Sequence, residues 1–174
     1  MSETTAPLVK STPDNRLARA VASVERLPAL LRPRAVTAVF RSQVRFVGTA
    51  GLSFEKLTKD EAVVVVKNRR AVQNHIRGVH AAAMALLAET ATGAVFGMNV
   101  PDTSLPLLES MHIDYVKRAT GAMRAVATLT AVQRALLTSE PKGDTVVAVT
   151  VTDETGVSPI AATMTWAWIP RKSG

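Results

Sequence analysis

The feature that most constrains the fold is the segment from residue 79 to 92, which is apolar on every side of a helix. The segment is rich in Ala, Leu and Met, which favour helices, and Gly93 follows it as the expected C-terminal cap. A helix of this kind must be enclosed, because a surface that touches one side cannot hide all of its faces. The sequence therefore predicts a sheet that curls around the helix and a partner subunit that covers the remainder.

Most of the other predicted elements are strands. Two strands are expected before the helix, at 52–57 and 62–67, and five after it, at 94–100, 107–118, 121–129, 145–153 and 160–169, with a short helix at 131–138. This order lacks the alternation of helices and strands that a parallel α/β sheet requires. We therefore expect an α+β fold with a curved antiparallel sheet. Trp166 and Trp168 alternate in the last strand and share one face, which favours packing over ligand stacking.

The N-terminal region is expected to be helical and to lie outside the β-rich core. Thr12-Pro13 is a suitable helix start, apolar residues follow at helical spacing as far as Pro28, and a second helix is expected at 34–41. The domain prediction comprises a disordered tail at 1–14 and a single domain at 15–174, with N-terminal helices at 15–41 and a core at 48–170.

Charge and composition restrict the classes of function. The net charge of +7 indicates a polyanionic partner, which could be nucleic acid, an anionic membrane surface or a molecule that carries phosphates. Only 4% of residues are aromatic, so a platform for stacking single-stranded nucleic acid is poorly supported. The absence of cysteine excludes thiolate metal sites and cysteine nucleophiles, and no other set of side chains has metal-ligand spacing. A cytoplasmic protein without a membrane span is expected.

Glu89 is the strongest candidate for chemistry. It is the sole formally charged side chain between Arg77 and Asp102, and it lies in the third turn of the apolar helix. An unpaired buried carboxylate is costly, so Glu89 either reaches solvent, pairs with an arginine, or is a general base or nucleophile whose pKa is set by enclosure.

A second group of polar residues precedes the helix, where free backbone N–H groups and the helix dipole favour a developing oxyanion. Asn74, His75 and His80 belong to it. Asn74 and His75 could instead cap the helix or satisfy a turn, and His80 could be a hydrogen-bonded packing residue. Ala81 and Glu89 are eight residues apart, which is roughly 12 Å along a helix. One subunit therefore cannot easily bring both Ala81 and Glu89 to the same substrate carbonyl. Two antiparallel copies of the helix, related by a twofold axis, could place Ala81 of one copy near Glu89 of the other.

The segment 74–83, followed by Glu89 and Gly93, resembles the hotdog-fold acyl-CoA thioesterases. The closest resemblance is to the branch that includes the phenylacetic-acid-pathway and hydroxybenzoyl-CoA enzymes and uncharacterised bacterial relatives. Asn74, His80 and Glu89 match that pattern in type and spacing, and the resemblance covers about residues 48 to 170, including the strand at 111–118.

The resemblance implies hydrolysis of a coenzyme A thioester as substrate, with no cofactor, in a homodimer or a dimer of dimers. Glu89 would activate water or attack the thioester carbon, an N–H near Ala81 or Ala82 would hold the carbonyl oxygen, and Asn74 and His80 would orient water or substrate. The alternative is a non-catalytic module that binds an acyl chain or an acyl carrier. It is favoured by Ala81-Ala82, since the thioesterases often have Gly-Gly there.

Basic residues could contact the phosphates of coenzyme A or simply form a solvated sheet edge. The candidates are Arg69, Arg70, Lys117 and Arg118. Ser110, His112 and Asp114 alternate along one strand and share a face, and the sequence leaves the direction of that face open.

Overall fold

The structure, a computed structural model, describes residues 15–172. In chain order its elements are α1 (Arg16–Val24), α2 (Arg32–Gln43), α3 (Arg45–Ala50), β1 (Ser53–Leu57), β2 (Glu61–Val66), the 3-10 turn η1 (Arg70–Val72), α4 (Ala81–Gly97), β3 (Ser104–Tyr115), β4 (Met123–Thr128), α5 (Ala131–Ser139), β5 (Gly143–Asp153) and β6 (Ile160–Pro170). Within residues 15–172, no helix combines the length and the apolar character needed to cross a bilayer.

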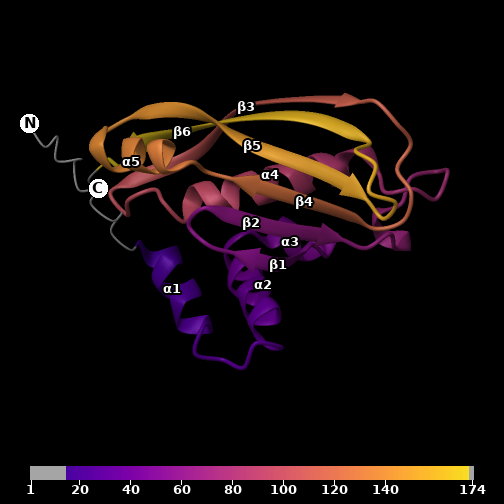
Figure 1. The fold of residues 1–174 in the computed structure, drawn as a ribbon, viewed down its shortest axis with the longest axis horizontal. Coiled ribbons are helices and arrows are strands. Elements are labelled where there is room, and N and C mark those ends of the chain that lie inside the picture. Colours follow the sequence, from indigo (N-terminus) through magenta and orange to yellow (C-terminus); the bar gives the residue numbers. More distant parts are fainter. Residues whose placement is uncertain (1–14, 173–174) are drawn as a thin grey trace, which may run out of the picture.

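The sheet has six strands in the order β1-β2-β4-β5-β6-β3, and every neighbouring pair is antiparallel. It curves around α4, which crosses its concave side, while α1 and α2 lie beyond β1 (Figure 1). The predicted architecture, an antiparallel sheet wrapped around one long central helix with extra N-terminal helices, is confirmed. β1 and β3 are the two edges of the sheet, so β3 has one side without a strand partner in the described chain.

The helix α4 fits this position because most of its surface is apolar and small. Leu87, Ala91 and Ala94 are completely buried. On the opposite side of the helix, every fourth residue is only half-buried, namely Ala85, Glu89, Gly93 and Gly97. This spacing makes one partly exposed face that runs along the helix, which we call its open face.

The end of α4 differs from the sequence prediction. The helix continues to Gly97, so the predicted C-cap at Gly93 and the predicted strand at 94–100 are both wrong. Gly93 lies inside the helix because the ring of Trp166 occupies the space of a side chain: a Cβ added there would lie 2.6 Å from the ring. The apolar run after Gly93 is a buried helical turn, and apolar periodicity does not separate such a turn from a buried strand.

The N-terminal helices are tied to the end of α4 by Asn15. Its side-chain oxygen caps α1 by accepting from Ala18 N at 2.8 Å, and its amide nitrogen donates to the carbonyl oxygens of Gly97 at 2.7 Å and Val100 at 2.6 Å. The predicted tail at 1–14 and the helix start at Thr12-Pro13 lie outside the described residues. The helix predicted at 34–41 is the longer α2, and α3 was not predicted.

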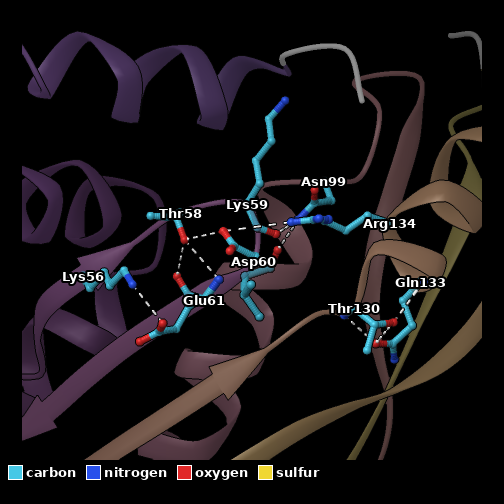
Figure 2. A network of polar contacts seen from close by, with 10 residues as sticks. Lys56, Thr58, Lys59, Asp60, Glu61, Asn99, Thr130, Gln133 and Arg134 are labelled. Carbon is cyan, nitrogen blue, oxygen red and sulfur yellow. Dashed lines mark hydrogen bonds and ion pairs between the residues drawn. The ribbon is translucent and has the colours of Figure 1, made fainter. Parts of the chain in front are cut away.

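A polar network joins the same C-terminal end of α4 to the turn between β1 and β2 (Figure 2). Asn99, just beyond the helix, donates to Lys59 O at 2.6 Å and to Val95 O at 2.8 Å. Thr58 Oγ1 donates to Asp60 at 2.9 Å, and Arg134 of α5 approaches the same carboxylate at 3.9 Å. The C-terminal end of α4 is therefore held by hydrogen bonds from two sides, Asn15 before α1 and Asn99 at the turn between β1 and β2.

Candidate active site

Glu89 lies on the open face of α4 and is half-buried. It lines a cavity of about 600 Å³ between α4, the N-terminal helices and the start of β3. The apolar part of the wall includes Leu17, Val39, Phe40, Val44, Val47 and Trp166. Polar and charged residues also line the cavity, namely Asn15, Arg16, Gln43, Glu89, Thr90, Asp102, Ser104 and Arg171. The volume is in the range of sites that bind a small organic ligand.

Burial raises the pKa of the Glu89 carboxyl, and the neighbouring Thr90 hydroxyl opposes the rise in part. No ion pair to Glu89 is found within the described residues, which leaves the desolvated carboxylate without a compensating cation. Thr90 also lines the cavity, and its hydroxyl is buried without a hydrogen-bond partner in residues 15–172. Thr90 therefore lies beside Glu89 without meeting the geometry of a hydrogen bond.

The N-terminus of α4 is a separate polar region. His80 is the N-cap, and its Nδ1 accepts from Ala82 N at 3.0 Å. The hydroxyl of Tyr115 donates to Ala81 O at 3.0 Å. Because the Ala82 N–H is already bonded to His80, the Ala81 N–H is the one at this end that has no acceptor in the described part of the chain. His80 thus caps the helix, a role that the sequence analysis gave as an alternative for Asn74 and His75.

Asn74 shapes the loop that leads into α4. Its Oδ1 accepts from Ile76 N at 3.1 Å and from Gly78 N at 3.0 Å, and its own N–H donates to Gly78 O at 2.9 Å. The loop also holds Arg77 at a φ of 63°, a left-handed conformation that is uncommon for a residue with a side chain. The side chain of Asn74 is therefore used to close the loop, and His75 is exposed.

The predicted cations divide into two groups. Arg69 lies beside α3 and donates to Thr49 O at 3.3 Å, and Arg70 is exposed in the next turn. Lys117 and Arg118 are exposed near the N-terminus of α4, where Arg118 donates to Ile76 O at 3.4 Å. None of these four lines the cavity that contains Glu89.

The cations that do line the cavity are Arg16 and Arg171, which the sequence analysis missed. Arg16 begins α1 and its backbone N–H donates to Asp102 at 3.0 Å, while Arg171 follows β6 and donates to Ser104 O at 3.2 Å. They lie near opposite ends of the chain, so no local pattern could have linked either of them to Glu89.

The direction of the polar face on β3 is settled by its pairing with β6. Met111 pairs with the completely buried Met164 and so faces α4, whereas Ser110 and His112 pair with Thr165 and Thr163 on the opposite, outer face. The series Ser110, His112 and Asp114 therefore points away from Glu89, and His112 contacts Asp114 at 3.4 Å. Trp166 and Trp168 share the inner face, as predicted, and both are buried in the core.

The arrangement provides two chemically complementary half-sites in each chain. One is the Glu89 carboxylate in its cavity, suited to accept a proton or attack a carbonyl carbon, and the other is the exposed N-terminus of α4 at Ala81, suited to stabilise an oxyanion. The eight residues between them correspond to roughly 12 Å along the helix. Within residues 15–172, no group of three or more His, Asp or Glu side chains is placed to hold a metal ion.

Several proteins of known structure share this fold. A Pseudomonas aeruginosa protein of unknown function, described as a probable thioesterase, superimposes with a TM-score of 0.72 at 23% identity, over 83% of this chain and 97% of that one. A Haemophilus influenzae thioesterase gives 0.64 at 11% identity, over 80% and 92%. A Staphylococcus aureus thioesterase gives 0.61 at 16% identity, over 73% and 100%. The fold class is therefore the hotdog fold, as the sequence predicted.

The particular family follows from the sequence. The family described as "Domain of unknown function (DUF4442)" matches residues 32–169, and the chain belongs to it. The match begins at the first residue of α2 and ends within β6, so α1 lies outside it. Comparison with curated proteins returned no match.

Proposed function

We propose that this protein is an acyl-CoA thioesterase that works as a homodimer, with Glu89 as its general base or nucleophile. The observation that carries the proposal is the position of Glu89: a half-buried carboxylate with a raised pKa, without an ion pair in the described residues, on the wall of a cavity with apolar and polar sides. A carboxylate whose pKa is raised toward the working pH is a better base than an exposed one.

In the proposed reaction, the acyl chain occupies the cavity and the thioester carbonyl lies beside Glu89. As a base, Glu89 takes a proton from water while the water oxygen bonds to the carbonyl carbon. The C–S bond then breaks, and the thiolate of coenzyme A leaves and is protonated. The carbonyl oxygen carries the negative charge of the tetrahedral intermediate and is held by the Ala81 N–H, because the Ala82 N–H is bonded to His80. Asn74 and His80 act as positioning residues, because they shape and cap the helix end that supplies this donor.

The shared site follows from the separation of the half-sites within one chain. A second copy, packed through the free edge of β3 with its α4 antiparallel, would bring its own helix N-terminus toward Glu89. The free edge supports this assembly because Met111 and Tyr115, both on the inner face, are about half exposed at 48% and 51%. Lys117 and Arg118 of one subunit would then lie near the partner's Glu89. Arg16 and Arg171 would lie near Glu89 of their own subunit, and cations of both pairs could contact a phosphate of coenzyme A.

The experiment is hydrolysis of short, medium, long and aromatic acyl-CoA thioesters by the wild type, Glu89→Gln and the control Glu140→Gln. The glutamine keeps the size of Glu89 and removes its charge, whereas Glu140 is exposed at the end of α5. We expect kcat to fall by roughly 10²- to 10⁴-fold in Glu89→Gln only. A wild type that is inactive on every thioester would exclude the thioesterase.

A second candidate is a non-catalytic module that binds acyl-CoA or an acyl carrier. It is favoured by Ala81-Ala82, whose methyl groups narrow the approach to the helix N-terminus, and by the use of the Asn74 and His80 side chains in structural hydrogen bonds. Calorimetric titration with a thioether analogue of acyl-CoA distinguishes the two. Saturable binding without turnover of the matching thioester would identify the binding module.

A further inference from the structure

The loop between α1 and α2 exposes three leucines within five residues. Leu30 is 90% exposed, Leu31 45% and Leu27 39%. Isolated apolar residues on a surface are ordinary, but a cluster at the end of a projecting element marks a contact with an apolar or interfacial environment. We define the α1–α2 tip as residues 25–34.

The backbone of the α1–α2 tip is ordered by hydrogen bonds. Leu27 N donates to Val24 O and Leu31 N to Pro28 O, both at 2.9 Å, and the guanidinium of Arg32 donates to Leu27 O at 2.9 Å. Pro28 and Pro33 further restrict the chain, because their rings fix φ. The leucines are therefore presented on a preformed turn, and little conformational entropy is lost when they insert into a partner.

The charge around the leucines is strongly positive. Arg26 precedes them and Arg32 and Arg34 follow, whereas Glu25 is the sole acid among residues 25–34. Basic residues that bracket a small apolar cluster match the surface of an anionic bilayer, where guanidinium groups lie at the phosphates and leucines enter the boundary with the acyl chains. A purely apolar protein partner would not need the arginines.

The α1–α2 tip is also remote from the edge that we assign to dimerisation. Figure 1 shows the tip at the bottom of the molecule, on the opposite side from β3. The helix α2 packs on β1, the other edge of the sheet. A dimer formed through β3 therefore leaves both copies of the tip accessible, and two weak anchors on one particle reinforce each other.

We propose that the α1–α2 tip docks this protein on the surface of membranes that contain anionic lipid. Leu30, with Leu27 and Leu31 beside it, enters the interfacial layer, and Arg26, Arg32 and Arg34 contact lipid phosphates. The attachment is peripheral and reversible. It does not depend on catalysis at Glu89, so it stands or falls separately from the proposed thioesterase.

The test is flotation of the full-length protein with vesicles of phosphatidylcholine alone or mixed with phosphatidylglycerol, at low and high salt. We expect binding to the mixed vesicles that weakens as salt rises, since each basic residue near the surface contributes a factor of about five. Leu30→Ser is expected to reduce binding roughly tenfold, and Arg26→Gln with Arg34→Gln by at least as much. The matched control is Val132→Ser, at a residue of α5 that is 71% exposed; it is expected to bind as the wild type.

Insertion itself is measured with Leu30→Trp and lipids brominated on the acyl chains. Because Trp166 and Trp168 are buried, we expect bromine to quench the introduced indole and to leave the wild-type fluorescence unchanged. The proposal is overturned if the wild type does not float, if Leu30→Ser floats as well as the wild type, or if Val132→Ser loses as much binding as Leu30→Ser. It is equally overturned if Leu30→Ser changes the oligomeric state in light scattering, which would assign the tip to a contact between copies.

Discussion

Gly93 of α4 lies directly beneath the ring of Trp166, so close that a Cβ at Gly93 would stand 2.6 Å from a ring carbon. The indole Nε1 is held in turn by Thr92 Oγ1 at 3.0 Å, and Trp166 is buried. The contact therefore joins the open face of the helix to the inner face of β6, at the cavity that Glu89 also lines.

Replacing Gly93 by alanine should destabilise the protein. Alanine favours a helix by about 1 kcal/mol, but the overlap with a fixed ring costs more, so we expect a net loss of roughly 1–2 kcal/mol. Gly97→Ala is the matched control, because its Cβ would lie 3.5 Å from Leu17, an ordinary contact. It should be neutral or up to about 1 kcal/mol stabilising in urea unfolding. Equal effects at the two glycines would contradict the packing argument.

Glu89 should make stability depend on pH with a defined sign. Burial raises the pKa of this carboxyl in the folded state, so the folded protein holds its proton at pH values where the unfolded chain has released it. The wild type is therefore free of the burial penalty below the ordinary pKa of glutamate. It loses stability as pH rises to the raised pKa, and the loss is constant above it.

The comparison that isolates this effect is Glu89→Gln, which cannot ionise. We expect the variant to be more stable than the wild type at neutral pH, and the difference to disappear in acid, with urea midpoints measured across the pH range. A difference that grows toward low pH would mean that the carboxylate is stabilised by a partner in the folded state.

The enclosed helix, the antiparallel sheet and the position of Glu89 in the helix could be predicted because each depends on a local sequence pattern. The absence of a polar face on α4 required a surrounding sheet, and Glu89 stood out as the single charge within that apolar stretch. The positions of all six strands followed from β-branched runs separated by turns. A seventh predicted strand, at 94–100, is helical for its first four residues, where Gly93 continues α4 beside Trp166, a contact across 73 residues that no local pattern encodes.

The rest of the site required tertiary structure. Arg16, Thr90 and Arg171 reach one cavity from three distant parts of the chain, so their sequence neighbourhoods contain no common signal. The outward direction of His112 depended on a bulge between Leu108 and Ser110, which reverses the alternation of faces within β3. The exposed β3 edge likewise became visible only when strand order was known.

His80 should act on function through the geometry of the helix end. Its Nδ1 accepts the Ala82 N–H, and the loss of an N-cap acceptor costs typically about 1 kcal/mol, so His80→Ala should lower stability by that amount. Asparagine is a good N-cap, so His80→Asn should restore most of the stability. If His80 only positions the helix, His80→Asn also restores kcat, and thermal unfolding and turnover recover together. Recovery of stability without turnover would show a direct role for the imidazole.

The proposed dimer can be tested at Met111, which faces inward from the edge strand and is 48% exposed. In a dimer joined through β3, Met111→Lys introduces one lysine into the interface from each subunit. The two lysines would lie close together and repel each other, and the apolar contact of Met111 would be lost, so both effects oppose association. We expect a folded monomer in light scattering, with circular dichroism unchanged and thioester hydrolysis lost, because each Glu89 would no longer face a partner helix. Val132→Lys on α5 is the matched control and should leave both the dimer and the activity intact. A Met111→Lys protein that is monomeric and fully active would show that one chain completes the site alone. A wild type that is monomeric at all concentrations would exclude a site shared between two subunits.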